Sequence, residues 1–111
     1  MSVNSEISFF EKCSILFNQI NGVRIVPIAN NHNYSLNKIN LCYGGDEDSS
    51  SFVIEYSTCC LELYGTEQVP SELVDALTKA LPGAQYQQYN LRTHYWSGKA
   101  IDDYFLNENR N

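Results

Sequence analysis

Positive charge is scarce in this sequence, in which seven Lys and Arg stand against thirteen Asp and Glu for a formal net charge of −6. Nucleic acids and anionic membrane surfaces repel an acidic chain, so neither is expected as a partner. No apolar run approaches the roughly 20 residues that span a bilayer. The segment Met1–Ser8 lacks the basic stretch that opens a signal peptide. We therefore expect a cytoplasmic protein.

Cysteines at zinc-ligand spacing are also missing. Structural zinc sites draw their ligands from closely spaced Cys pairs or paired His, and Cys13, Cys42, Cys59 and Cys60 do not follow that spacing. Disulfides need an oxidising compartment, and the neighbouring Cys59 and Cys60 point to opposite faces if they lie on a strand. The sequence predicts free, mostly buried thiols, with no metal and no cofactor.

The chain does contain enough apolar material for one core. Hydrophobic residues make up 43% of its 111 residues, and aromatic residues make up 13%, with eight Tyr among them. A chain of this length buries roughly two-thirds of its unfolded surface and has no room for two independent cores. Residues 1–111 are therefore expected to form a single domain.

The first half of the chain predicts one helix followed by strands. Apolar residues recur at helical spacing over Ser5–Ile20, and Val23–Ile28 is a short β-branched segment with the Pro typical of an edge strand. The Asn-rich stretch Ala29–Asn40 is interpreted as a long loop or a loosely paired segment. Ile39–Tyr43 alternates as a strand does and forms a hairpin with Phe52–Tyr64, which is long enough for one bent strand or two.

The second half predicts helices set apart from a strand. Val69–Leu81 has an apolar face at helical spacing, Gln85–Trp96 alternates as a single strand, and Ala100–Phe105 indicates a short terminal helix. Hairpins with separate helices favour the α+β class. We expect an antiparallel sheet of about four to five strands with two to three helices packed on it, in the order α-β-β-β-α-β-α.

Two groups of residues bear a partial likeness to enzyme sites. A Cys nucleophile needs His32 or His94 as its base. Cys13 lies on an apolar helix face and is expected in the core, the other three cysteines lie in strand patterns without electropositive neighbours, and His94 is assigned to the polar face of its strand. Glu55 and Glu62 lie on strand segments as the two carboxylates of a glycosidase do, although solvated carboxylates on a sheet face are far more frequent. We expect no catalytic activity.

An aromatic strip near the last predicted strand is the one feature that favours nucleic-acid binding. Tyr86, Tyr89, Tyr95 and Trp96 offer rings on which bases can stack. Such a surface needs interleaved Lys or Arg, and this segment offers only Arg92 and Lys99. Packing against the sheet is the favoured interpretation of these aromatics.

Acidic residues beside aromatic ones instead predict a site for a basic protein. The acidic groups steer the encounter with a basic partner and the aromatic side chains anchor it. The candidate partner-binding residues lie at the tip of the predicted hairpin and around the start of the terminal helix: Asp46, Glu47, Asp48, Tyr95, Trp96, Asp102, Asp103 and Tyr104.

In overall character the chain resembles the small immunity proteins of bacterial toxin systems, including those of contact-dependent growth inhibition. The resemblance rests on its size, on the acidic Asp46-Glu47-Asp48 and Asp102-Asp103, and on the Asn-rich Asn30-Asn31-His32-Asn33. It implies a protein that binds the C-terminal toxin domain of a secreted effector, often a basic nuclease, and occludes its active site.

Two alternatives share these features. The first is a phage- or mobile-element-encoded inhibitor or regulator that binds a host protein, and gene neighbourhood separates it from an immunity protein. The second is a small hydrolase with an unrecognised site, which should lose function almost completely when His94, Glu55 or Glu62 is replaced, whereas a binding protein should lose it only in part.

Overall fold

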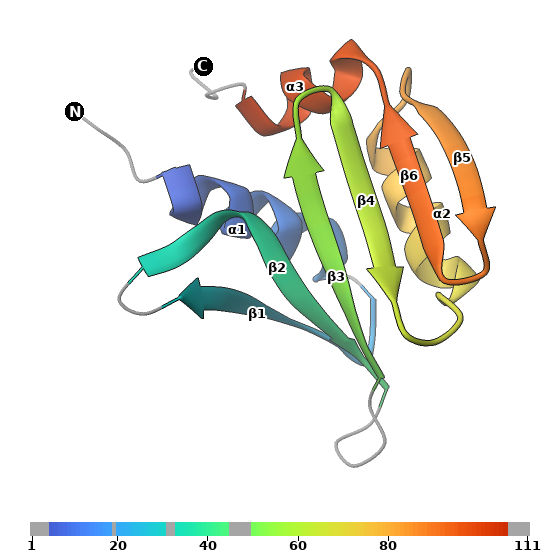
Figure 1. Ribbon diagram of the computed structural model, residues 1–111, viewed down its shortest axis with the longest axis horizontal. Coiled ribbons are helices and arrows are strands. Elements are labelled where there is room, and N and C mark those ends of the chain that lie inside the picture. Colours follow the sequence, from blue (N-terminus) through green and yellow to red (C-terminus); the bar gives the residue numbers. More distant parts are fainter. Residues whose placement is uncertain (1–4, 19, 31–32, 45–49, 107–111) are drawn as a thin grey trace.

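The computed structural model describes residues 5–18, 20–30, 33–44 and 50–106 of the chain (Figure 1). Within these ranges the chain forms three helices and six strands. In chain order they are α1 (Ser5–Phe17), β1 (Val23–Asn30), β2 (Asn33–Tyr43), β3 (Ser50–Ser57), β4 (Cys60–Gly65), α2 (Ser71–Ala80), β5 (Gln85–Asn90), β6 (Thr93–Ser97) and α3 (Lys99–Leu106).

The strands form one antiparallel sheet in the order β1-β2-β3-β4-β6-β5. The predicted α+β class and antiparallel sheet are confirmed, as are the three helices. The predicted strand count is wrong, because the observed order is α-β-β-β-β-α-β-β-α. After α2 the chain passes to the outer edge as β5, and β6 then returns between β5 and β4.

The Asn-rich segment Ala29–Asn40 was interpreted as a long loop or a loosely paired segment, and its described residues are paired as strands. β2 begins at Asn33 and pairs with β1 along its length. Asn33 lies opposite Asn30 at one end and Tyr43 lies opposite Val23 at the other, with an irregularity between Pro27 and Ala29. Its second half also pairs with β3. Asn has a low strand propensity. In this segment, however, pairing with neighbouring strands gives the backbone N–H and C=O groups the hydrogen-bond partners that water would supply in a loop.

Two segments that the sequence pattern assigned to strands each form a hairpin of two strands in the structure. Phe52–Tyr64 divides into β3 and β4, as one of the two interpretations anticipated. The prediction of one strand over Gln85–Trp96 is wrong, since the chain turns at Leu91 and Arg92 between β5 and β6. Asn90 forms this turn by accepting a hydrogen bond of 2.8 Å from the backbone N–H of Arg92 to its Oδ1, the local bond that makes Asn a turn residue.

The core lies on one side of the sheet. In Figure 1, α1 and α2 lie behind the sheet, and α3 lies at the end nearest the β3–β4 turn. The buried residues come from alternate positions of the central strands, among them Leu61 and Leu63 of β4, and from the apolar sides of the three helices, such as Phe17, Leu77 and Ile101. In the part of the chain that the structure describes, no helix covers the opposite face of the sheet.

Candidate functional site

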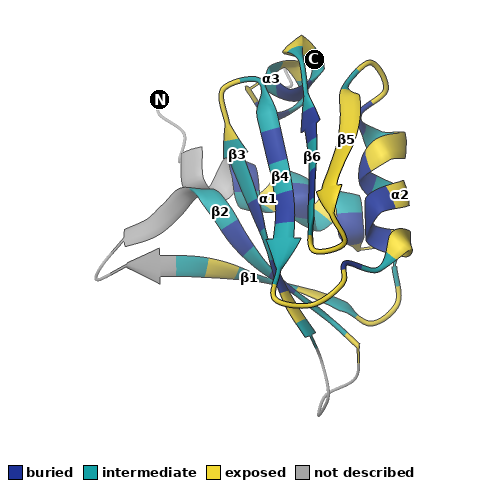
Figure 2. Cartoon of the chain, turned by 45° about the vertical axis from the view of Figure 1, so that its right-hand side comes forward, coloured by how far each residue is buried: buried dark blue, intermediate teal, exposed yellow. Residues whose placement is uncertain are grey.

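The helix-free side of the sheet, called the open face below, presents a continuous row of polar side chains. Cross-strand pairing places Lys38 opposite Glu55, Glu55 opposite Glu62, Glu62 opposite Tyr95, and Tyr95 opposite Gln87. The row therefore crosses β2, β3, β4, β6 and β5. In Figure 2, β4 alternates between buried and half-buried residues, as expected of a strand with one covered face.

Two carboxylates lie side by side at the centre of this row. Glu55 and Glu62 are directly opposite each other on β3 and β4, and both are half-buried. Directly opposed residues have Cβ atoms about 5 Å apart, so two like charges there are mutually unfavourable. The Tyr64 hydroxyl donates a hydrogen bond of 2.8 Å to Glu55 Oε1, and Lys38 neighbours Glu55 across the strands.

Two tyrosines lie beside the carboxylates. Burial and the hydrogen bond to Glu55 raise the pKa of Tyr64 to about 12, so its hydroxyl remains a donor at neutral pH. Tyr95 is the cross-strand partner of Glu62 and donates a hydrogen bond of 2.6 Å to Gln87 Oε1. Paired carboxylates with aromatic rings nearby are suited to a Lys ammonium or an Arg guanidinium.

Tyr95 was predicted from the sequence as a partner contact. Glu55 and Glu62 were considered only as a pair that resembles the carboxylates of a glycosidase, and Tyr64 was not predicted. The alternation of polar and apolar residues along β4 could have indicated the open face from the sequence. Cys60, Glu62 and Tyr64 lie on one side of this strand, and Leu61 and Leu63 lie on the other. Locating its partner Glu55 required the register of β3 against β4.

The prediction of Trp96 as a partner contact is wrong. Its side chain is fully buried in the core, where its indole N–H donates a hydrogen bond of 3.1 Å to Thr78 Oγ1 of α2. Tyr95 lies on the open face because neighbouring strand residues point to opposite sides. The predicted acidic tip of the hairpin, Asp46-Glu47-Asp48, lies outside the described residues.

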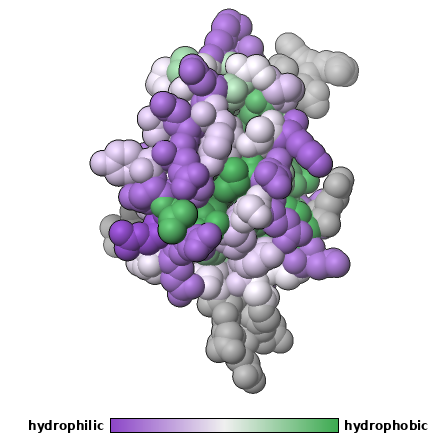
Figure 3. Space-filling view, turned by 90° about the vertical axis from the view of Figure 1, so that its right-hand side faces the viewer, coloured by the Kyte–Doolittle hydropathy of each residue, from purple (hydrophilic) through white to green (hydrophobic). Residues whose placement is uncertain are grey.

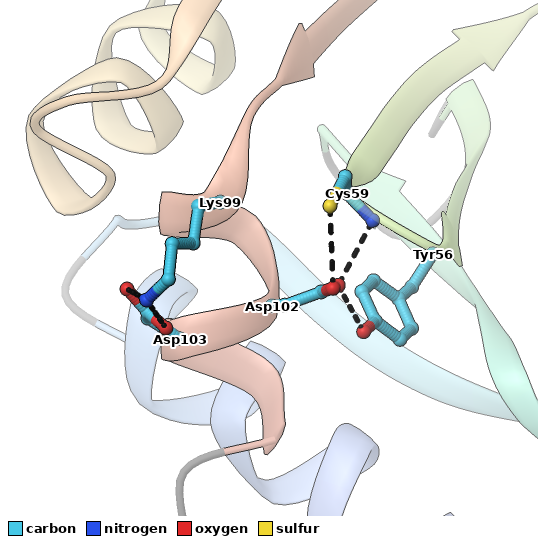
Figure 4. A network of polar contacts seen from close by, with 5 residues as sticks. All are labelled: Tyr56, Cys59, Lys99, Asp102 and Asp103. Atoms are coloured by element: carbon cyan, nitrogen blue, oxygen red, sulfur yellow. Dashed lines mark hydrogen bonds and ion pairs between the residues drawn. The ribbon is translucent and has the colours of Figure 1, made fainter.

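Asp102 connects α3 to the β3–β4 turn through hydrogen bonds (Figure 4). Its carboxylate accepts hydrogen bonds from the Tyr56 hydroxyl at 2.5 Å, from the Cys59 backbone N–H at 2.9 Å and from the Cys59 thiol at 3.3 Å. These bonds keep the pKa of Asp102 below its usual value. They also hold Cys59 in a left-handed conformation, with φ of 57°, at the β3–β4 turn.

Asp103 and Tyr104 line a groove on the helical side of the molecule. Asp103 forms an exposed ion pair with Lys99 at 3.1 Å, and the Lys12 ammonium donates a hydrogen bond of 2.7 Å to the Tyr104 backbone carbonyl. The groove has a volume of about 520 Å³ and is also lined by Ile15 of α1 and the turn after α2. Tyr95 on the open face and the pair Asp103 and Tyr104 at this groove therefore lie on different sides of the molecule.

His94 of β6 is buried on the covered face of the sheet, which corrects its assignment to a polar strand face. Only 5% of the residue is exposed; Nδ1 lies 2.7 Å from the Tyr86 hydroxyl, and Nε2 has no hydrogen-bond partner. Burial lowers the pKa of His94, although the nearby Leu91 carbonyl acts in the opposite sense. A neutral ring is therefore favoured.

The four thiols are free, but only Cys13 is fully buried, and the other three are half-buried. Burial raises the pKa of Cys13 and Cys60, and the hydrogen bond to Asp102 raises the pKa of Cys59. A raised pKa keeps a thiol protonated and weakly nucleophilic at neutral pH. None of these three is prepared to act as a thiolate.

In the described ranges, no three His, Cys, Asp or Glu side chains come together as a metal ion would require. Among the helices of these same ranges, none has the length and apolar character to cross a membrane. Comparison of the chain with protein-family models, with curated proteins and with solved structures gives no match.

Proposed function

We propose that this chain is an immunity protein, which binds the toxin domain of a secreted effector in the cytoplasm and neutralises it by occluding its active site. The observation that carries the proposal is the pair of adjacent carboxylates, Glu55 and Glu62, at the centre of an open sheet face. The tyrosines beside them and the net charge of −6 give the same preference for a basic partner.

The like charge of the pair provides a reason to bind a cation. Glu55 and Glu62 repel each other across β3 and β4 in the free protein. A guanidinium or ammonium group placed between them removes that repulsion and gains charge-assisted hydrogen bonds. Both effects are present only in the complex, so they contribute directly to affinity.

The same chemistry explains how such a face inhibits a nuclease. A nuclease uses Lys, Arg and His to attract phosphates, so two fixed carboxylates can take the places of two phosphates in its active site. Tyr64 and Tyr95 supply large, stiff contact surfaces beside the charges, as aromatic anchors do in protein interfaces. The negative charge of the whole chain increases the rate of encounter.

Co-expression with the protein encoded next to this chain tests the proposal. An immunity gene lies immediately downstream of its toxin gene, so the upstream product is expressed in a bacterial host with and without this chain. We expect growth to stop without the chain and to recover with it. Calorimetry with the purified pair should then show tight binding, with an association rate that falls as salt rises.

The double substitution Glu55→Gln with Glu62→Gln identifies the face. We expect it to weaken binding by about thirty-fold or more, as the loss of a central charge pair does. The matched control is Glu11→Gln with Asp75→Asn, which removes the same charge from two exposed helix positions. Equal losses of affinity in the two double variants would mean that only the net charge of the chain matters. Recovery of growth without any complex between the two proteins would overturn the proposal.

A further inference from the structure

β5 is the outermost strand of the sheet at the end opposite β1, and all six of its residues are exposed. Its sequence, Gln85–Asn90, contains no charged residue and no Pro. Among the described residues, β5 pairs on one side only, with β6, in a regular register from Gln85 to Gln88. The other side presents backbone N–H and C=O groups for which a further strand would be the natural partner.

The opposite edge is protected in the ways that natural proteins use. β1 carries the exposed Arg24 and the exposed Pro27, and its pairing is irregular between Pro27 and Ala29. A charge, a Pro and a bulge each hinder the addition of another strand. The irregularity in β5 comes only at its end, between Gln88 and Asn90. The two edges of one sheet therefore differ in their readiness to pair.

Exposed apolar side chains are also concentrated at β5. Of the five large hydrophobic residues that are exposed in the described ranges, three lie on β5 or in the turn that follows it: Tyr86, Tyr89 and Leu91. Tyr89 is 75% exposed and Leu91 is 57% exposed. Figure 3 views the molecule from the β5 and α2 side and shows hydrophobic surface among hydrophilic residues.

We propose that β5 is the interface of a homodimer, in which it pairs antiparallel with β5 of a second copy and joins the two sheets into one. Charge decides between a second copy and a basic partner. A basic partner is attracted by carboxylates, and β5 has none, whereas two copies of an acidic chain meet with least repulsion along an uncharged strand. This inference does not depend on the function proposed above.

Sedimentation velocity of the purified chain, from about 5 µM to about 500 µM, tests the dimer by mass action. We expect a monomer–dimer equilibrium that Gln87→Lys shifts toward the monomer by about ten-fold, because a lysine on an edge strand opposes the addition of another strand. Gln85→Lys is a second variant, since Gln87 accepts a bond from Tyr95. Asn18→Lys, at an exposed position after α1, is the matched control.

Hydrogen exchange locates the interface. Backbone amides of β5 should become protected at high concentration in the native chain and in Asn18→Lys, but not in Gln85→Lys or Gln87→Lys, with circular dichroism confirming that every variant is folded. A monomer at every concentration overturns the proposal, and so does a dimer that neither β5 variant weakens. Protection of β5 that appears only with the toxin partner overturns it in favour of a different added strand.

Discussion

The two faces of strand β4 show how one backbone can serve two purposes. Leu61 and Leu63 point into the core and are fully buried, whereas Cys60, Glu62 and Tyr64 point to the open face and are half-buried. Apolar burial on the first side stabilises the fold by roughly 25 cal/mol per Å² removed from water. The second side retains an unfavourable charge pair that the fold does not need. Substitutions should therefore separate stability from recognition.

Neighbouring residues of β6 give the largest expected contrast between the faces. Trp96→Ala should lower the free energy of unfolding by about 3–5 kcal/mol, because it leaves a cavity and removes the donor to Thr78. Tyr95→Ala, one residue away on the open face, should lower it by less than about 1 kcal/mol. Urea denaturation followed by circular dichroism measures both. Similar losses for the two variants would contradict the division of the sheet into two roles.

The hydrogen bonds between α3 and the β3–β4 turn should give a smaller difference in stability between two variants. Asp102→Ala removes the acceptor for Tyr56 and for the backbone of Cys59, so the left-handed turn loses its support. Asp103→Ala removes the same charge but breaks only an exposed ion pair with Lys99. We expect the thermal midpoint to fall clearly more for Asp102→Ala. Equal shifts would mean that the hydrogen bonds of Asp102 stabilise the fold no more than an exposed ion pair does.

His94 is a polar residue on the covered face, and it should give the smallest effect. Because its pKa is lowered by burial, the folded protein binds this proton less readily than the unfolded protein, whose His titrates near 6.5. The stability it contributes is complete above that value and is lost as the pH falls toward the lowered pKa.

Urea denaturation from about pH 7.5 to about pH 5 should detect this loss, and His94→Gln should reduce the slope in that window. An unchanged slope in the variant would show that other groups cause the dependence. The Tyr86 hydroxyl bonds to Nδ1, so protonation of the ring also acts on the contact between β5 and β6.

The sequence predicted the helices and the β2–β3 hairpin correctly because both have strong periodic patterns. It left the first part of β2 open between a loop and a loosely paired segment, and it treated β5 and β6 as one strand, for different reasons. Asn33–Asn40 has a low strand propensity, and its structure comes from pairing with neighbours that are distant in sequence. The β5–β6 turn contains no Gly or Pro, and Asn90 was its only local signal.

The error at this turn also explains the misplaced His94, which was grouped with Asn90 and Arg92 on one polar strand face. Trp96 was assigned to a partner surface because acidic residues follow it in the sequence. The structure buries both on the covered face, while Tyr95 between them lies on the open face. The neighbourhood of Glu55 and Glu62 depends on strand register, which local sequence patterns do not determine.

The aromatic contacts between the first and last helices have a consequence for synthesis. Phe9 of α1 and Phe105 of α3 have ring centroids 5.2 Å apart, and Tyr56 of β3 lies against both. Translation delivers Phe9 almost an entire chain length before Phe105. Until α3 leaves the ribosome, the apolar side of α1 therefore lacks part of its cover, and the N-terminal helix completes its packing only when the last helix has been made.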